Sequence, residues 1–309
     1  AFSVDGYGFD QWKKLFTPRQ LVALGVIIKK IRYLYNDINN VYLDATWGES
    51  ISAFILCGFS RFLDFCNTSV QWKIDVPTIN HSFVRFALPI VWDFAEGNAI
   101  GKLAGSASIC FDRISTGLDS YRDLTLSNSP LTILKQSAIS KKEIGFDAIV
   151  TDPPYYDAIP YSDLMDFFYI WLRRALYGLS PEIDKAFAEP LAPKWNHDTN
   201  DGELIDDASR FDNNQELSKR NYEDGMARAF QACHAALKPN GRFVVVFAHK
   251  QPDAWETLAS AMVKAGFVVT ASWPIQTEMA NRTRAMASAA LASSIWMVCK
   301  KRPTTARPG

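Results

Sequence analysis

From residue 130 onward, short runs of β-branched and aromatic residues alternate with segments of helical periodicity. Strands are expected at 131–134, 146–150, 242–248, 267–273 and 294–300. Helices are expected at 162–176, 221–237 and 254–265. Strands that alternate with helices and are apolar throughout are typical of mostly parallel sheets with helices on both faces. The pattern therefore predicts an α/β fold. It does not decide whether the last two strands pair antiparallel.

The first 129 residues have a different character and predict a helix-rich segment. Thr17 and Pro18 form a helix entry, with Thr as the N-cap and Pro at the first helical position. A second helical pattern covers residues 41–66, and the Gly-, Ser- and Asp-rich stretch 97–129 predicts a loop-rich connection. We therefore expect a helical part before residue 130 and a catalytic α/β part at 130–302.

Two other stretches interrupt this plan. The polar, Asp- and Asn-rich stretch of about 182–220 predicts an inserted loop or lid, and residues 303–309 predict a frayed tail. Residues 238–241 (KPNG) predict a turn between a helix and a strand.

Composition limits the class of protein. The 33 Lys and Arg balance the 33 Asp and Glu, so the overall basicity typical of nucleic-acid binders is missing, although a local basic patch remains compatible with neutrality. The five cysteines contain no C-x-x-C pair, which argues against a zinc ribbon and a disulfide framework, and no metal site is expected. Because no apolar run reaches the roughly 20 residues of a membrane span and the N-terminus resembles no secretory leader, we expect a cytoplasmic protein without membrane contact.

The tetrad Asp152-Pro153-Pro154-Tyr155 follows the strand expected at 146–150. It therefore lies at the carboxyl edge of the predicted sheet, where open α/β sheets bind ligands. An exocyclic amine on a base is a poor nucleophile, because its lone pair is delocalised into the ring. Asp152 and the Pro153 carbonyl can both accept hydrogen bonds from that amine and aim its lone pair at an electrophilic methyl group.

The other two residues of the tetrad complete this catalytic hypothesis. Pro153 and Pro154 fix φ and carry no N–H that would compete for the acceptors. The Tyr155 ring offers a face for a base that has left its duplex. The alternative is a Pro-Pro turn that ends a strand beside a buried tyrosine.

At this point the chain resembles a known family. The resemblance rests on the runs FDAIVTDPPYYDAIPYSDLMDFFYIWLRR, LKPNGRFVVVFAHKQPDAW and SAALASSIWMVCKK, together with LFTPRQLVAL and LPIVWDFAEGN. These runs look like the prokaryotic adenine-specific DNA methylases of the zinc-ribbon-containing type. Those enzymes are class I methyltransferases that use S-adenosylmethionine. The resemblance implies a Rossmann-like sheet, S-adenosylmethionine as cofactor, DNA as partner and transfer of a methyl group to the N6 amine of adenine.

The chain departs from this family in its cofactor motif. The family carries an Asp-Pro-Phe-x-Gly-x-Gly loop upstream of the residues seen here, and this sequence contains none. The segment most similar to that loop, residues 43–48, contains one glycine and has helical periodicity. The family's zinc ribbon is missing too. Either an upstream domain or a partner chain supplies the loop, or the chain is a degenerate relative.

Other residues are candidates through the resemblance or through topology. Phe16, Thr17 and Pro18 resemble the helix entry that meets the methionine end of the cofactor, where free N–H groups suit a carboxylate. An ordinary capped helix is the alternative. Ser137 occupies the place of a cofactor-adenine contact, for which it is a weak substitute.

The residues after the tetrad are candidates for the base pocket. Tyr156, Asp157 and Tyr161 extend the corner, and Lys250 follows the strand at 242–248 at the same sheet edge. His249 lies close to the site by topology. Tyr161 could equally cap the next helix.

We therefore predict an adenine-specific DNA methyltransferase that works by direct transfer, without a covalent intermediate or a metal. Two rivals stay open. One is methylation of RNA or of a protein amide, because related enzymes use such tetrads on other planar amines and amides. The other is a non-catalytic DNA-binding or scaffold subunit, which the missing glycine-rich loop favours.

Overall fold

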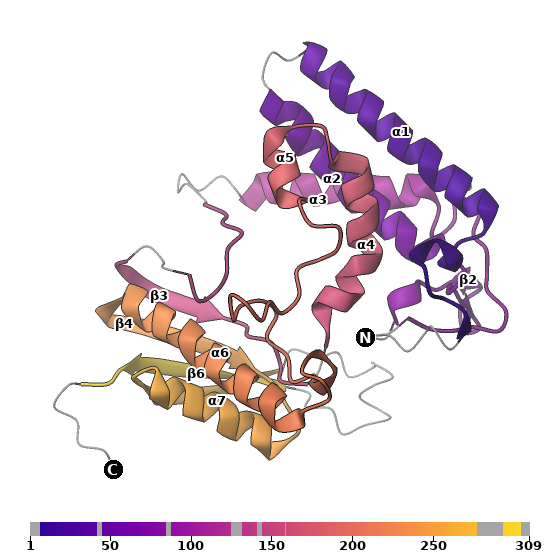
Figure 1. The fold of residues 1–309 in the computed structure, drawn as a ribbon. Helices are drawn as coiled ribbons and strands as arrows, with labels where there is room; N and C mark the ends of the chain where they lie inside the picture. Colours follow the sequence, from indigo (N-terminus) through magenta and orange to yellow (C-terminus); the bar gives the residue numbers. More distant parts are fainter. Residues whose placement is uncertain are drawn as a thin grey trace. The chain divides into compact units, whose positions relative to one another are not determined.

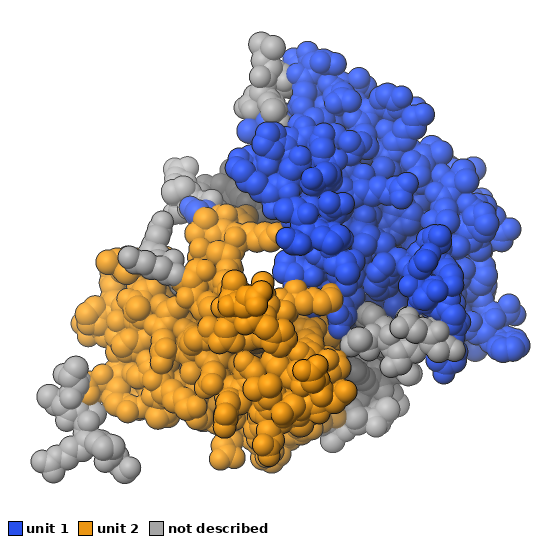
Figure 2. All heavy atoms as spheres, in the orientation of Figure 1, with its two compact units in different colours: residues 1–132, 161–193 blue, residues 133–160, 194–309 orange. Residues whose placement is uncertain are grey.

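The computed structural model of the chain describes residues 7–41, 45–84, 88–124, 132–140, 144–157, 159–276 and 293–303. The chain divides into two compact units, coloured separately in Figure 2. Unit 1 comprises residues 1–132 and 161–193, and unit 2 comprises residues 133–160 and 194–309. The segment 161–193, which the sequence assigned to the catalytic part, thus groups with the N-terminal residues.

Unit 1 is helical (Figure 1). It has its own apolar core. Its helices are α1 (Pro18–Val41), α2 (Ala45–Phe65), α3 (Ala107–Leu124), α4 (Tyr161–Leu176) and α5 (Pro181–Ala186). It also contains two short 3-10 helices, η2 (Trp12–Leu15) and η3 (Ser82–Val84). Two strands of two residues each, β1 (Trp72–Lys73) and β2 (Thr78–Ile79), pair antiparallel. Phe59, Phe62 and Leu63 of α2 are fully buried in this core, together with Leu24 of α1 and Phe167 of α4. The helices predicted at 41–66 and 162–176 are confirmed.

Helix α1 begins as the sequence predicts. The Gln20 backbone N–H donates to Thr17 Oγ1 over 3.3 Å, and the Thr17 N–H donates to Gln20 Oε1 over 2.8 Å. This reciprocal pair is a capping box, which satisfies two N–H groups that a helix start leaves without partners. The Thr-Pro-x-Gln spacing therefore has a structural role of its own.

The prediction of a loop-rich connection at 97–129 is wrong for residues 107–124, which form α3. Within the helix, Ser and Asp side chains that suggested a loop are exposed, at Ser108, Asp112, Ser115, Asp119 and Ser120. Phe111 and Ile114 face α2 instead, at a point where Gly58 has no side chain and a Cβ would lie 2.7 Å from the Phe111 ring. Packing against this glycine overrides the polar composition of the segment.

Unit 2 is a mixed sheet with two helices. Its elements are β3 (Phe146–Thr151), a 3-10 turn η4 (Ala208–Arg210), α6 (Gln215–Ala236), β4 (Leu237–Phe247), α7 (Pro252–Lys264), β5 (Phe267–Gln276) and β6 (Ser293–Lys301). The strand order is β3-β4-β6-β5, with β3 parallel to β4 and β6 antiparallel to both of its neighbours (Figure 1). The α/β class and four of the five predicted strands are confirmed. The last two strands, β5 and β6, pair antiparallel, which the sequence left undecided. Because β4 and β6 also pair antiparallel, the expectation of a mostly parallel sheet is wrong for the described strands.

The core of unit 2 lies on one face of this sheet. Phe243, Val245 and Phe247 of β4 are fully buried there against apolar residues of α6 and α7. Among the described residues, α6 and α7 both cover this face. The sequence had predicted helices on both faces of the sheet. The opposite face is less buried: 61 % of Val150 and 62 % of Trp273 are accessible, and Val244 and Val246 are half-buried.

Three local predictions need correction. Residues 132–134 form no strand, because Ile133 and Leu134 are exposed and pair with no other strand among the described residues; Leu131 lies outside those residues. Residues 238–241 are a bulge within β4, since Leu237 pairs with Phe146 and Arg242 with Ala148. Helix α6 starts at Gln215 rather than 221, because the Asn214 side chain caps it by accepting from the Leu217 N–H. The predicted insertion is thus partly helical.

Candidate functional site

The tetrad Asp152–Tyr155 leaves the carboxyl end of β3, as predicted. Thr151, the last residue of β3, pairs in parallel with Val245, two residues before β4 ends. The loop after β4, with His249 and Lys250, therefore emerges at the same edge of the sheet as the tetrad. Parallel pairing of β3 and β4 is what brings these two segments together.

A buried tyrosine fixes the corner behind the tetrad. The Tyr222 hydroxyl on α6 donates to the Pro154 carbonyl oxygen over 2.6 Å, and it accepts from the Tyr156 N–H over 3.1 Å. Tyr222 is 2 % exposed, and burial raises the pKa of its phenol to about 12. The hydroxyl therefore stays protonated and can keep donating to Pro154.

Tyr156 adopts a left-handed backbone conformation with φ of 55°. A bulky residue is rarely found there, and such strain persists only where the surroundings hold it. Its ring packs edge-on against Tyr222, its carbonyl accepts from the Asp206 N–H over 3.2 Å, and its hydroxyl is hydrogen-bonded to the Asp206 carboxylate. Burial, followed by this contact with Asp206, raises the pKa of Tyr156.

Asp206 in turn is held by α6 and the turn before it. Its carboxylate accepts from Ser218 Oγ over 2.6 Å and from Gln215 Nε2 over 2.9 Å, and its residue is 8 % exposed. The strained corner is thus built into a connected network of buried polar groups. Networks of this kind are rigid when every member has a partner.

The groups that face outward from the corner are acceptors. Asp152 is exposed, and its Oδ1 accepts from the Tyr155 hydroxyl over 2.6 Å. The Tyr155 ring lies edge-on to Phe247 with centroids 5.3 Å apart. Among the described residues, no group donates to the Pro153 carbonyl, whereas the Pro154 carbonyl is taken by Tyr222. Asp152 and Pro153 therefore present acceptors that a ligand amine can reach.

A second pair ties the loop after β4 to the corner. His249 Nε2 lies 3.0 Å from Asp157 Oδ1, and His249 Nδ1 accepts from the Gln251 N–H over 3.1 Å. Because Nδ1 is an acceptor, the neutral ring carries its proton on Nε2 and donates to Asp157. Lys250, the next residue, is exposed.

A hollow of about 390 Å³ lies beside Asp157 and is lined by acidic residues. Asp206 and Asp207 share it with Asp157, together with Ser209 and Gln215. Carboxylates repel phosphate and attract groups that donate hydrogen bonds. This hollow therefore suits an amine or amide better than a nucleic-acid backbone.

The three cofactor candidates near the N-terminus have structural roles in unit 1. Thr17 and Pro18 form the start of α1, and Phe16 is 6 % exposed with its ring stacked on Phe167 at 5.7 Å. The Glu96 carboxylate already lies at this helix start, where it accepts hydrogen bonds from Nε and Nη2 of Arg19. The hydrogen bond from Arg19 lowers the pKa of Glu96. The anion at the α1 N-terminus is thus the protein's own.

The remaining candidates are placed as follows. The Ser137 hydroxyl donates to Asp201 Oδ1 over 2.8 Å within unit 2. Tyr161 is the first residue of α4 in unit 1 and is 54 % exposed. The segment 43–48 was the part of the sequence most similar to the cofactor loop. Its residues 43 and 44 lie outside the described residues, and residues 45–48 begin α2. None of the described positions among them forms a glycine-rich loop.

Sequence reasoning missed Tyr222 and Asp206, which hold the corner. Both lie within or beside the polar stretch that predicted an insertion. A tyrosine in the middle of a helix carries no signal of its own for such a contact. The sequence around it gives one weak indication of burial, because Tyr222 is an aromatic residue among mostly polar neighbours.

Comparison with known proteins adds no assignment. No protein-family model, curated protein or solved structure matches the chain. Across the described ranges, no group of three or more His, Cys, Asp and Glu side chains is arranged to hold a metal ion. The helices in those ranges all lack the length or the apolar character that a bilayer crossing needs.

Proposed function

We propose that this chain carries the amine-orienting half of a methyltransferase that acts on the N6 amine of adenine in DNA. The observation that carries the proposal is the pair of outward-facing acceptors at the end of β3. The Asp152 carboxylate is exposed, and the neighbouring Pro153 carbonyl accepts from no described group. The next carbonyl, on Pro154, is fixed by Tyr222.

These residues have defined tasks in the proposed reaction. Asp152 and the Pro153 carbonyl accept the two N–H groups of the amine and so draw its nitrogen toward tetrahedral geometry. This geometry would aim the lone pair at the methyl group of a sulfonium donor, whose S–CH₃ bond would break and release a thioether as the C–N bond forms, and one proton would then leave the cationic nitrogen. Tyr155 holds Asp152 through its hydroxyl, and its ring offers a surface for the base. The methyl donor implied by the family resemblance is S-adenosylmethionine.

The described residues do not complete a pocket for that donor. Thr17 and Pro18 form a capped helix start with Glu96 beside it, and Ser137 is bonded to Asp201. None of these described residues is therefore assigned to the cofactor. Its binding loop, in our proposal, comes from another segment or from a partner chain.

The edge of β3 supports this part of the proposal. On its outer side, β3 pairs with no other strand among the described residues, and 41 % of Phe146 and 61 % of Val150 are accessible. Strands that pair in parallel are normally buried on both faces, and open apolar edges are normally covered. A further strand beside β3 would bring the loop that follows it next to Asp152, because ligand loops gather at this edge.

The test joins calorimetry with a transfer assay. S-adenosylmethionine is titrated into the chain, and transfer of its tritiated methyl group is then followed on duplex DNA that contains adenine. A matched duplex has purine in place of adenine and so lacks the exocyclic amine. Where the chain binds the donor, we expect label only on the adenine duplex and loss of label in Asp152→Ala.

Other outcomes would overturn the proposal. Label on RNA or on a protein amide, with none on DNA, would favour the first rival substrate class. A folded chain that binds S-adenosylmethionine yet labels nothing would not be a transferase. By contrast, a folded chain that binds no S-adenosylmethionine would agree with a donor loop on a partner chain and would not be an enzyme alone.

A further inference from the structure

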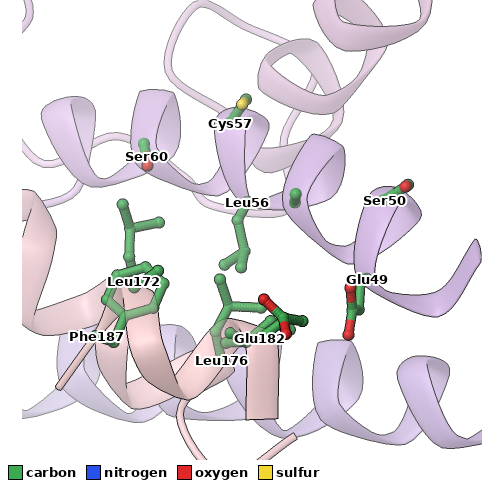
Figure 3. A pocket seen from close by; sticks show the side chains of 12 residues that line it. Glu49, Ser50, Leu56, Cys57, Ser60, Leu172, Leu176, Glu182 and Phe187 are labelled. Carbon is green, nitrogen blue, oxygen red and sulfur yellow. The ribbon is translucent and has the colours of Figure 1, made fainter. Parts of the chain in front are cut away.

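A groove in unit 1 lies between α2 on one side and α4 with α5 on the other (Figure 3). We infer that it binds an amphipathic helix of a partner protein, one that carries Lys or Arg near one end. This inference is independent of the proposed methyl transfer, because none of the lining residues belongs to the tetrad or its supporting network. The groove has a volume of about 520 Å³.

Small residues of α2 form one side of the groove. Ser50, Ala53, Cys57 and Ser60 recur at spacings of three and four, so they share one face of the helix. From the first to the last they cover about 15 Å of helix axis, at roughly 1.5 Å per residue. A face of small side chains lets the backbone of another helix approach closely.

Larger apolar residues form the base and the opposite wall. Leu56 of α2 is 1 % exposed, and Leu172 and Leu176 stand one turn apart on α4. Ile183 and Phe187, in and just after α5, complete this wall. Apolar side chains of an incoming helix, spaced three and four residues apart, would be received here, as in other helix-in-groove complexes.

Two carboxylates set the charge of the occupant. Glu49 of α2 and Glu182 of α5 lie at the same end of the groove in Figure 3. Glu182 also pairs with Lys185 over 2.6 Å, but both side chains are about seven-tenths exposed, so this pair is weak. Charge complementarity therefore calls for a cationic residue at this end of the partner helix.

The groove is open to solvent along its length. Ser50, Ala53 and Cys57 on one side and Ala186 on the other are all exposed. A site that encloses a small molecule buries most of its surface, which these exposed walls would not do. A rod-shaped occupant that lies along α2 fits this form.

The reactivity of the Cys57 thiol reports whether the groove is occupied. All five cysteines of the chain are free thiols, and Cys57 is the exposed one while the other four are buried. Burial raises the pKa of Cys66 to about 12 and that of Cys299 to about 11, which slows their reaction further. In the native chain, Ellman's reagent should therefore react rapidly with Cys57 alone, and Cys57→Ser should remove that phase.

The probe is a synthetic 14-residue helical peptide with leucines at positions i, i+4 and i+7 and two arginines at one end. We expect saturating peptide to slow the Cys57 reaction about tenfold or more, because bound peptide covers the thiol. Glu49→Gln combined with Glu182→Gln should weaken binding about fivefold. Glu216→Gln combined with Glu256→Gln, both in unit 2, is the matched control and should change nothing. Ala53→Arg should fill the groove and abolish protection while keeping the helix.

Four outcomes would overturn the inference. The first is equal protection by a peptide with glutamates in place of the arginines. The second is equal protection by a peptide that a central proline prevents from forming a helix. The third is protection by hexylammonium as strong as that by the peptide, which would indicate a small organic cation. The fourth is protection that rises with protein concentration alone, which would indicate a second copy of the chain.

Discussion

The Tyr222 hydroxyl donates a 2.6 Å hydrogen bond to the Pro154 carbonyl oxygen, although 68 residues separate the two in sequence. This bond removes the Pro154 carbonyl from the surface of the corner. The Pro153 carbonyl, one residue earlier and beside Asp152, accepts from no group among the described residues. A residue on α6 thereby decides which of two adjacent carbonyls the end of β3 presents.

Tyr222→Phe tests this relationship. Loss of the hydroxyl removes a hydrogen bond to Pro154 and an acceptor for the Tyr156 N–H. We expect the free energy of unfolding to fall by about 1–2 kcal/mol. If the corner orients an amine, methyl transfer should slow about ten- to a hundredfold, because small misplacements of reacting groups are costly. Denaturant titration and the tritium assay measure the two effects.

Tyr169→Phe is the matched control for that variant. The Tyr169 hydroxyl also donates to a backbone carbonyl, that of Glu189, over 2.9 Å, but it does so in unit 1. It should cost similar stability and leave the transfer rate unchanged. Equal rate losses in the two variants would contradict a specific role for Tyr222.

A second prediction separates the ring of Tyr155 from its hydroxyl. Tyr155→Phe keeps the ring beside Phe247 and removes the hydroxyl with its 2.6 Å hydrogen bond to Asp152. Tyr155→Leu removes the aromatic face as well. We expect the Phe variant to lose about tenfold in transfer rate and the Leu variant about a further tenfold, in line with about 1–3 kcal/mol for stacking on a base. A Leu variant as active as the Phe variant would show that the ring contacts no base.

The structure also predicts a loss of stability in alkali. Burial raises the pKa of Tyr222 to about 12, and it raises that of Tyr156 as well. A free tyrosine ionises near pH 10, so above that pH the unfolded state loses protons that the folded state keeps. This stabilisation is therefore complete below about pH 10 and is lost as the pH rises toward about 12. Tyr222→Phe should flatten the slope by up to about 1.4 kcal/mol per pH unit.

Denaturant titrations at several pH values between 9 and 12 check this slope. Tyr177→Phe is the control, because Tyr177 is 43 % exposed. Its slope should match that of the parent chain. A parent chain whose stability stays constant through this range would contradict the buried environment of both tyrosines.

The sequence predicted the elements of this fold better than their assembly. Periodicity located α1, α2, α4, α7 and four strands, because each carries enough apolar residues to bury one face. It misjudged α3, whose formation depends on contact with Gly58, a residue about 50 positions earlier. It also missed the role of Tyr222, because a hydrogen bond between residues 68 apart depends on tertiary packing.

The candidate site divides in the same way. The motif Asp152–Tyr155 could be placed at the sheet edge because a strand of known direction precedes it. Tyr156 was named as a pocket residue, but its positive φ and its contact with Asp206 depend on the turn before α6. Local patterns thus locate the reactive corner, and the residues that hold it in place come from distant segments.

The His249–Asp157 pair makes a spectroscopic prediction. Because His249 Nδ1 accepts from the Gln251 N–H, the neutral ring should be the tautomer protonated at Nε2. ¹⁵N NMR of labelled histidine at neutral pH distinguishes the two tautomers. Asp157→Asn keeps an acceptor and should preserve the tautomer, whereas Asp157→Ala should cost about 0.5–1.5 kcal/mol in stability. A ring protonated at Nδ1 would contradict the geometry.

The open edge of unit 2 makes the last prediction. Val150 of β3 is 61 % exposed. Its neighbours Ile149 and Thr151 pair with Phe243 and Val245, whose side chains lie on the face that α6 and α7 cover. Because side chains alternate along a strand, Val150 lies on the opposite, uncovered face. Exposed apolar edge strands associate with other chains, and a lysine on the edge suppresses this. Val150→Lys should therefore reduce self-association of the chain in sedimentation velocity, with stability changed by no more than about 0.5 kcal/mol.

Val263→Lys, on α7 and 57 % exposed, adds the same charge away from the edge and should leave association unchanged. If both variants reduced association equally, general charge repulsion would explain the effect, and the β3 edge would have no special part in binding another strand.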